Sequence, residues 1–542
     1  MKKLLALTLA AFAFAACEKT AEDNNVQQNG ELEKSYISIT LASSEMGTRA
    51  EDELGKEFED GDPTESAVKK AYVFFFRDGE AFPVSYSNNT TTEGPANGSN
   101  YLPLNLEMND EATATNNVSD YSDEILVIEN YKGEYPNQVI AVLNWQPTAT
   151  NYNIAGLQKE LLNIQNSDGS FVMCNSVYAD ESTPKKTIIA TPITEANIGT
   201  EDDLDNLAAV QIYVERLAAK VTYSAADGGK FDIGKTVLDR ETNTEIKVYA
   251  QIKGYELFNA YYDSWLVKQI DPNWDNTNLG FTWNDSPNYR SYWADSYTNR
   301  SSLDFPTSNS FNWADNPAEA YCGENTNTDA DARTKVIIKA QLVKEDGVTP
   351  VEVVNWLGKD YVGEDYLKIV VANTLNQKYF SSTDEELYVG LVPDDLKCVA
   401  SASTADNAYY VYFQLEDATA GYGIDKTWYE RTADGKYEDV ADMNSELMNV
   451  HPALVYNDGM TYYYTDIRHL ANDVAKTGAY GVVRNHVYKV NITGIQGFGT
   501  PVYDPTQDLV EVDTPDEIYT YVSAQINILS WRVVDRNYVV GE

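Results

Sequence analysis

The chain has 542 residues, of which 43% are hydrophobic and 12% aromatic, so it can bury large cores and form roughly two to four domains. Its 84 acidic and 40 basic side chains give a formal net charge of −44, which argues against nucleic acid as a partner and against adhesion to anionic lipid by charge. An acidic surface is typical of a secreted protein that must stay soluble.

The N-terminus has the pattern of a secretory signal. Lys2 and Lys3 precede an apolar run over 4–16, which ends in small residues directly before Cys17. This arrangement resembles the lipobox of bacterial lipoproteins, in which Cys17 would receive the lipid and become the new N-terminus. Phe14 stands where the usual pattern has Leu, and the alternative is an ordinary signal peptide cleaved elsewhere. No later segment is apolar for long enough to span a bilayer, so we expect a soluble body anchored at most by lipid.

A polar tether over 18–33 leads into a strand over 34–42 that is predicted to be half-buried. The apolar face of this strand consists of Ile37, Ile39 and Leu41, which alternate with polar positions. The following segment, 43–50, has no periodicity and contains Arg49. We interpret it as an exposed loop of the kind that proteases cut.

The body of the chain predicts many short strands separated by turns. They lie at 68–79, 124–130, 137–145, 170–180, 208–227, 245–257, 335–347, 408–417, 460–468 and 485–495. Apolar residues recur at helical spacing only over 153–164, which predicts one short helix on a sheet. Many short strands with few helices favour β-sandwiches, and two sandwiches fit the length.

Residues 229–236 match the P-loop pattern letter for letter. A phosphate site would need a helix that begins just after Gly234, because the N–H groups of the first helical turn bind the phosphate. The sequence that follows predicts a turn and then a strand. We therefore interpret the match as a coincidence.

The remaining chemistry-bearing residues form no catalytic or metal pattern. The three histidines are scattered: His451, His469 and His486. No HExxH or GxSxG motif occurs. Asp329 and Asp331 resemble the start of a calcium loop but lack its glycine and its terminal glutamate. We predict no catalytic residues, no metal and no other cofactor.

Three cysteines follow Cys17, namely Cys174, Cys322 and Cys398. So few cysteines do not build a disulfide scaffold. For a chain in an oxidising compartment, a disulfide between Cys322 and Cys398 is an alternative to free thiols.

The segment 271–305 is rich in Asn, Asp, Ser, Trp and Tyr and lacks strand alternation over most of its length. Such a segment is either a long loop pinned by its own rings or a binding surface. Aromatic and amide side chains together suit sugar recognition. The candidate glycan contacts are Trp274, Trp283, Tyr289, Tyr292 and Trp293.

The chain ends in a strongly patterned strand behind an acidic, proline-containing linker over 501–515. The phase of the alternation flips after Leu529, as a β-bulge would cause. Its apolar row consists of Ile518, Val522, Ala524, Ile526, Ile528, Trp531 and Val533. This strand is either an ordinary last strand of its own domain or a strand that is donated to another chain.

The two ends of the chain can be related physically. Removal of the first strand by a cut at Arg49 would leave an apolar groove and unpaired backbone groups, both of which are costly to expose. A C-terminal strand from another copy would fill that groove, with about five apolar side chains contributing on the order of ten kcal/mol before entropy is subtracted. Repeated head to tail, this β-augmentation gives an open fibre. Until the cut, the first strand of the chain itself blocks the groove.

At this point the sequence resembles the Bacteroidales fimbrillins, the shaft subunits of type V pili, and most closely the shaft subunit of the short, minor fimbriae. The resemblance is carried by Cys17, "SYISITLA", "GTRA" around Arg49, "QVIAVLNW", "VERLAAKV", "VRNHVYKVNITGI" and "INILSWRV". It implies an all-β fold of two transthyretin-like β-sandwich domains with few short helices. It also implies a structural, non-enzymatic role in adhesion and virulence. The segment 271–305 departs from the family and is longer or differently used here.

The resemblance further implies export as a lipoprotein to the outer membrane and cleavage between Arg49 and Ala50 by an arginine-specific protease. Polymerisation into extracellular fimbriae would follow by donor-strand exchange. The implied partners are neighbouring pilin subunits, the fimbrial anchor and tip subunits, and the protease. Contact with the membrane would be made only through the lipid of the precursor. The alternatives are a tip or accessory adhesin and a surface glycan-binding lipoprotein.

We expect the chain to divide into five parts. They are a lipoprotein signal peptide over 1–17, a tether with the removable first strand over 18–49, an N-terminal β-sandwich domain over 50–213, a C-terminal β-sandwich domain over 214–500, and a linker with the donor strand over 501–542.

Overall fold

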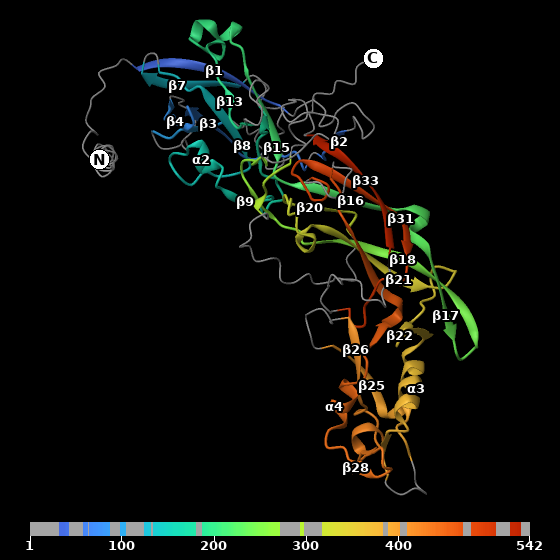
Figure 1. Cartoon of the computed structure of the whole chain (residues 1–542). Helices are drawn as coiled ribbons and strands as arrows, with labels where there is room; N and C mark the ends of the chain where they lie inside the picture. Colours follow the sequence, from blue (N-terminus) through green and yellow to red (C-terminus); the bar gives the residue numbers. More distant parts are fainter. Residues whose placement is uncertain are drawn as a thin grey trace, which may run out of the picture.

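A computed structural model describes thirteen stretches of the chain. They are residues 32–42, 58–62, 64–86, 98–104, 124–131, 134–179, 187–271, 293–297, 317–382, 389–401, 409–469, 478–505 and 521–532. Strands dominate these stretches and helices are few and short (Figure 1). The all-β fold expected from the sequence is confirmed. In the described part of the chain, none of the helices has the length and apolar character needed to cross a membrane.

The N-terminal sheet folds over a core of its own. Its central path is β4 (Glu80–Ala81), β3 (Ala71–Arg77), β8 (Gln138–Leu143), β10 (Met173–Asn175), β15 (Val210–Arg216), β1 (Leu32–Ala42), β7 (Glu124–Tyr131) and β5 (Ser85–Tyr86), with β6 (Tyr101–Pro103), β13 (Thr191–Pro192) and β14 (Ile198–Gly199) at its sides. Side chains of β1 and β7 share one buried cluster with side chains of β3 and β8 from the other half of the sheet. The sheet therefore closes on itself as a sandwich.

Two sheets enclose the second core. The smaller one runs in the order β2 (Phe58–Asp60), β33 (Tyr521–Arg532), β31 (His486–Gln496), β16 (Ala219–Ala225) and β20 (Glu319–Cys322). The larger one runs in the order β25 (Leu396–Ala400), β26 (Tyr410–Leu415), β29 (Ala453–Tyr456), β22 (Val353–Trp356), β23 (Lys359–Val362), β17 (Lys230–Asp239), β18 (Thr244–Phe258), β21 (Lys335–Val343), β30 (Met460–Asp466) and β32 (Thr500–Pro501). Buried residues from both sheets form one cluster, as in an aligned sandwich.

A lobe of β25, β26, β29, α3 (Glu364–Leu375) and α4 (Met443–Met448) continues the larger sheet at the end of the molecule opposite the N-terminal sheet (Figure 1). It has its own buried cluster. A small sheet of β24 (Tyr379–Phe380), β27 (Tyr429–Arg431) and β28 (Tyr437–Asp439) borders it. The helix α3 was not expected from the sequence, because its apolar residues do not follow a clear helical period.

The helix predicted over 153–164 is much shorter than expected. The helix α2 covers only Ile154–Leu157 and is capped by Asn153, whose Oδ1 accepts a hydrogen bond from the N–H of Gly156 at 2.7 Å. The chain then enters β9 (Leu161–Asn163), which pairs with β19 (Asp263–Trp265). The period-3.6 pattern thus arose from a helical turn followed by a strand. A further short pair joins β11 (Tyr178–Ala179) and β12 (Thr187–Ile188).

The P-loop match at 229–236 lies in β17 and the turn before it, with a register shift between Asp232 and Lys235 where the strand pairs with β18. No helix begins after Gly234, so the first-turn N–H groups that bind a phosphate are missing there. The interpretation of this motif as a coincidence is consistent with the structure. Cys174, Cys322 and Cys398 are buried free thiols, so no bridge joins Cys322 to Cys398.

Candidate functional site

The first strand, β1, lies inside the N-terminal sheet and is paired along both edges. On one side it runs antiparallel to β7, with Leu32 opposite Tyr131 and Ile39 opposite Glu124. On the other side it runs antiparallel to β14 and then parallel to β15, from Ile39 opposite Val210 to Ala42 opposite Tyr213. Removal of β1 would therefore expose two strand edges, not one.

The side chains of β1 that were predicted to face the core do so. Ile37 and Ile39 are 0% exposed and Leu41 is 2% exposed, and all three belong to the buried cluster of the N-terminal sandwich. Ser35, on the same face, is also buried, whereas on the other face Lys34 is exposed, Tyr36 and Thr40 are partly buried and Ser38 is buried. The half-buried strand expected from the sequence is thus observed, as in a sandwich whose strands turn one face to the core.

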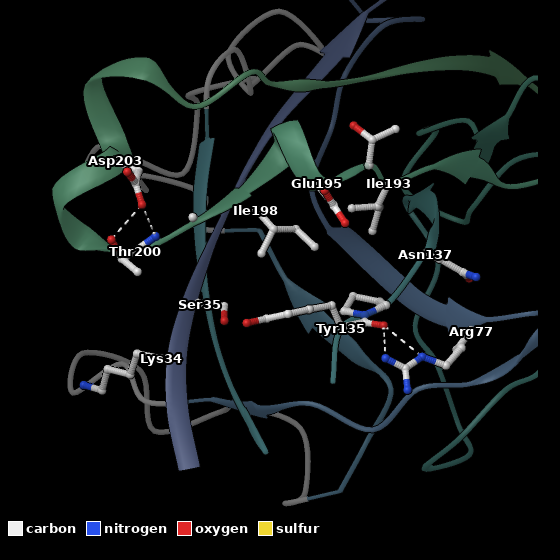
Figure 2. Close-up of a pocket in the computed structure, with 13 residues that line it drawn as sticks. Lys34, Ser35, Arg77, Tyr135, Asn137, Ile193, Glu195, Ile198, Thr200 and Asp203 are labelled. Carbon is white, nitrogen blue, oxygen red and sulfur yellow. Dashed lines mark hydrogen bonds between the residues drawn. The ribbon is translucent and has the colours of Figure 1, made fainter. Parts of the chain in front are cut away.

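A cavity of about 610 Å³ lies beside the N-terminal end of β1. It is lined by Lys34, Ser35, Arg77, Tyr135, Pro136, Asn137, Ile193, Thr194, Glu195, Ile198, Gly199, Thr200 and Asp203. Figure 2 shows Ser35 of β1 and Ile198 of β14 among the side chains that line this cavity. Most of the polar residues at its rim are exposed, so the cavity opens to solvent.

The charged groups around this cavity have partners of their own. The guanidinium of Arg77 donates from Nε and Nη2 to the carbonyl oxygen of Tyr135, at 3.0 and 2.6 Å. The carboxylate of Asp203 accepts hydrogen bonds from the N–H and Oγ1 of Thr200, at 2.8 and 2.7 Å, and these bonds hold the pKa of Asp203 below its usual value. Gly199 permits this turn, since a Cβ at Gly199 would lie only 2.8 Å from the Cβ of Asp203.

The C-terminal strand, β33, is held mainly from one side. It pairs antiparallel with β31 from Gln496 opposite Tyr521 to His486 opposite Ser530, with a register shift between Ile492 and Gly494. Its other edge pairs only with the short strand β2, which lies parallel to Ser530–Arg532. Within the described residues, most of β33 therefore has one neighbouring strand, whereas β1 has two.

The packing of β33 against the larger sheet is incomplete. Val522 and Ala524 are half-buried and lie against the core of the C-terminal sandwich. A second cavity of about 590 Å³ lies between the N-terminal part of β33 and the C-terminal part of β30. It is lined by Tyr464, Thr465, Asp466, Arg468, Tyr480, Val522, Ser523 and Ala524. Close packing is therefore missing at this end of the strand.

A buried charge cluster ties the residues that follow β2 to the C-terminal sandwich. Nζ of Lys220 lies 2.8 Å from Oε1 of Glu65 and 2.8 Å from Oε2 of Glu319. The hydroxyl of Tyr321 donates to both carboxylates, and Nε of Arg216 donates to the carbonyl oxygen of Glu65 at 2.9 Å. Burial raises the pKa of Glu65, but the hydrogen bonds from Lys220 and Tyr321 outweigh burial, so its pKa lies below the usual value.

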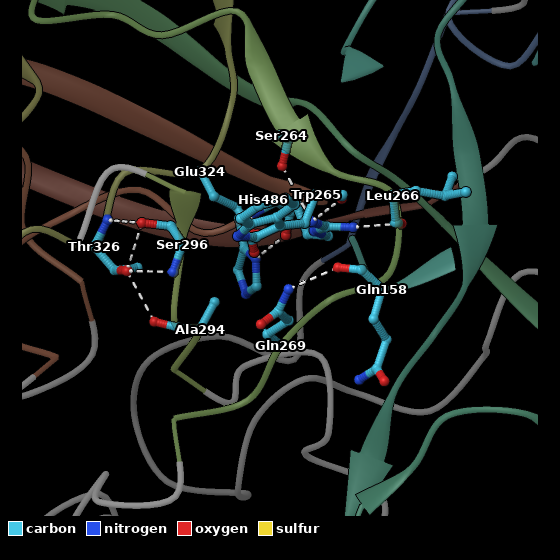
Figure 3. Close-up of polar contacts among 11 residues, drawn as sticks. Gln158, Ser264, Trp265, Leu266, Gln269, Ala294, Ser296, Glu324, Thr326 and His486 are labelled. Carbon is cyan, nitrogen blue, oxygen red and sulfur yellow. Dashed lines mark hydrogen bonds and ion pairs between the residues drawn. The ribbon is translucent and has the colours of Figure 1, made fainter. Parts of the chain in front are cut away.

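A second buried charge, Arg484, joins the loop before β31 to the strand β19. Figure 3 shows its partners Glu324, Trp265 and Leu266. Its Nη2 lies 2.9 Å from Oε2 of Glu324 and 2.6 Å from the carbonyl oxygen of Trp265, and its Nη1 lies 3.1 Å from the carbonyl oxygen of Leu266. Arg484 is 0% exposed. None of the residues Glu65, Lys220, Arg216 and Arg484 was predicted from the sequence as a functional residue. The available signal was a charged residue inside or beside an apolar strand, as in "VERLAAKV" and "VRNHV".

Several predicted site residues lie outside the described residues. They are Cys17, Arg49, Ala50, Ile518, Val533, Trp274, Trp283, Tyr289 and Tyr292. For Ile526, Ile528 and Trp531 the structure describes the backbone in β33 but not the side chains.

Trp293 is the one candidate glycan contact in the described part of the chain, and it is 1% exposed. Its ring lies 5.3 Å from that of His469, whose Nδ1 is 2.9 Å from the hydroxyl of Tyr488. Gly481 makes room for the ring, since a Cβ there would lie 2.7 Å from the indole. A ring in this position cannot stack on a sugar at the surface, so the structure gives the glycan hypothesis no support from Trp293.

Comparison with known proteins gives one family match and several distant structural neighbours. Residues 454–537 match the model of the C-terminal part of the major fimbrial subunit protein type IV, fimbrillin. This range contains β30, β31, β32 and β33. A search of curated proteins finds no match.

The solved structures that align with the chain include a fimbrilin from Porphyromonas gingivalis, with 11% identity over 92% of this chain and 98% of that one, at a TM-score of 0.35. A tip fimbrial protein from the same species aligns with 10% identity over 92% of this chain and 100% of that one, at a TM-score of 0.29. A fimbrial assembly protein from Parabacteroides distasonis aligns with 12% identity over 76% of this chain and 100% of that one, at a TM-score of 0.25. Similarities of this size carry no conclusion by themselves. Residues 454–537 therefore resemble the C-terminal region of fimbrillins, and the resemblance to the fimbrillin family expected from the sequence is confirmed.

Proposed function

We propose that this protein is a fimbrial shaft subunit that polymerises by donor-strand exchange after a cut has separated β1 from the rest of the chain. The precursor is a lipoprotein, acylated at Cys17 and held at the outer membrane, and an arginine-specific protease cuts it between Arg49 and Ala50. The mature subunit then joins neighbouring subunits, together with anchor and tip proteins, in an extracellular fimbrium for adhesion. The fimbrillin match at 454–537 supports the role as a fimbrial subunit.

The observation that carries the exchange mechanism is the position of β1. This strand buries Ile37, Ile39 and Leu41 in the N-terminal core and pairs along both edges. Once it is removed, the sandwich is left with an apolar groove flanked by unpaired backbone groups of β7 and β15. Each unpaired buried group costs about 1–3 kcal/mol, so the open groove favours any strand that restores the ladder.

The strand β33 is the best donor among the described elements. It has 12 residues, and β1 has 11, so the two are of similar length. Its sequence continues the alternation that a sandwich core requires. Among the strands that the structure describes, β31 alone pairs with most of its length. A strand with one neighbour and incomplete packing loses less on leaving than it gains from a groove with two edges.

A truncation tests this proposal. Deletion of residues 521–542 removes β33 but leaves β1 and its groove unchanged, so the precursor should fold and be cut yet stay monomeric. A matched control carries Ser523→Ala, which alters an exposed side chain of the same strand and should assemble normally. SDS-resistant multimers from the truncated chain would contradict the role of β33 as the donor.

A further inference from the structure

We propose that the cavity beside Ser35 is the place where the C-terminal strand of a second copy first contacts the subunit, before β1 has left. This inference rests on the proposed function and adds the order of events. It concerns the cavity lined by Ser35, Ile193 and Ile198 and by the polar rim described above (Figure 2).

The position of the cavity follows from the side chains of β1. Four residues of the same parity face the N-terminal core in series, and all four are buried: Ser35, Ile37, Ile39 and Leu41. Three are large and aliphatic, and the fourth, Ser35, is small and lines the cavity. The first strand therefore fills its groove at three positions and leaves the fourth underfilled.

The inner surface of the cavity suits an aliphatic side chain. Ile193 is 7% exposed and lies in the core cluster, and Ile198 packs against that cluster. Arg77 and Asp203 are engaged with Tyr135 and Thr200, so they remain at the rim. An entering apolar side chain would thus bury its surface against Ile193 and Ile198 without displacing a charge.

The donor sequence has a matching row of four apolar residues at alternate positions: Val522, Ala524, Ile526 and Ile528. We align these four residues end to end with the four core-facing residues of β1. Either Val522 or Ile528 then takes the position of Ser35, depending on the direction in which the donor strand runs. Both residues are β-branched and larger than serine. The donor therefore fills the underfilled position whichever way it runs, which gives it a contact that β1 lacks.

The occupant is accordingly the C-terminal strand of a second copy, because the cavity is continuous with the groove of β1. Binding there anchors the donor while β1 still occupies the other three positions. Displacement then proceeds from the Ser35 end toward Leu41. The unpaired stretch of backbone at any moment is short, which lowers the cost of exchange.

The test fills the cavity with a larger side chain at position 35 of β1 itself. Ser35→Ile places an aliphatic side chain of β1 in the cavity, so the cut precursor should form multimers about tenfold or more slowly than the unsubstituted chain. The matched control is Thr40→Ile, on the other face of β1, which adds the same side chain without entering the cavity and should assemble at the unsubstituted rate. An equal rate for Ser35→Ile, or equal slowing by Thr40→Ile, would overturn the inference.

A second measurement does not depend on rates. Replacement of Ile198 by the photo-crosslinker p-benzoylphenylalanine should give multimers in which Ile198 is crosslinked to a peptide within 521–533 of another copy. Crosslinks to other segments only would contradict the assigned site. Absence of multimers from the unsubstituted, cut chain would instead contradict the proposed function itself, so the two failures can be told apart.

Discussion

Ile37 of β1 lies directly opposite Leu126 of β7 in antiparallel register, and both side chains are buried in the N-terminal core. The strand that the proposed cut removes is therefore an integral part of the first sandwich. Under the proposed exchange, the precursor and the assembled subunit share this core with different strands in the same place. Substitutions in β1 should therefore change the stability of the precursor alone, whereas substitutions in its neighbouring strands should change the stability of both the precursor and the polymer.

Ile39→Ala should destabilise the precursor by about 2–5 kcal/mol, because it removes a fully buried side chain and leaves a cavity. The same substitution should leave the assembled polymer as stable as before, since β1 is absent from it. Chemical unfolding of the precursor and the temperature at which multimers dissociate in SDS measure the two effects.

Val210→Ala is the matched control, because Val210 of β15 lies opposite Ile39 and is 3% exposed. Val210 stays in the subunit after the cut. This substitution should weaken both the precursor and the polymer. A polymer weakened by Ile39→Ala would show that β1 is retained in the fibre.

The charge cluster around Glu65 should make stability depend on pH. The pKa of Glu65 is lowered in the folded protein, so its contribution is present above the ordinary value of 4.5 and is lost as the pH falls through the lower, folded value. For Lys220, burial lowers the pKa, but the hydrogen bonds that its ammonium donates to Glu319 and Glu65 outweigh burial. Its raised pKa therefore gives stability that is present below 10.5 and is lost at higher pH.

Glu65→Gln should cost about 1.5–3 kcal/mol at neutral pH, and the difference from the unsubstituted chain should shrink as the pH falls below 4.5. Asp232→Asn serves as the control, since Asp232 pairs with Lys247 at 2.6 Å on the exposed surface and should change stability little. Urea unfolding at a series of pH values gives the free energy of unfolding of each variant as a function of pH. A constant effect of Glu65→Gln across the acid range would refute the assignment.

The buried pair of Arg484 and Glu324 should behave as a unit. Arg484→Met leaves Glu324 buried without its cation, which should cost about 3–5 kcal/mol. The double variant Arg484→Met with Glu324→Leu should recover part of this loss, because the carboxylate of Glu324 is then no longer buried without its cation. Equal losses in the single and double variants would show that the bonds of Arg484 to the carbonyl oxygens of Trp265 and Leu266 dominate instead.

The strands were largely predictable from the sequence, because alternating apolar and polar residues indicate a strand with one buried face. The strands around Phe74, Val248, Ile338 and Val490 all lie in predicted ranges. The row of Ile37, Ile39 and Leu41 was predicted for the same reason. Burial of Ser35 and Ser38 was not, since a serine gives no apolar signal whichever side it faces.

The helices and the buried charges could not be predicted in the same way. In α3, Ile369 is 39% exposed while Val371 is buried, so apolar residues lie on several sides of the helix and blur its period. At 153–164 a strand follows a single helical turn and continues its spacing by chance. The partners of Glu65 and Arg484 are more than a hundred residues away in the chain, and only tertiary structure brings them together.

The most direct test of the account is limited digestion of the lipid-free precursor with an arginine-specific protease, with the new N-terminus and the particle mass read from the same sample. We predict a chain that starts at Ala50 and forms a ladder of SDS-resistant multimers, while Arg49→Ala stays uncut and monomeric. A chain that starts at Ala50 and remains a monomer would contradict polymerisation by strand exchange.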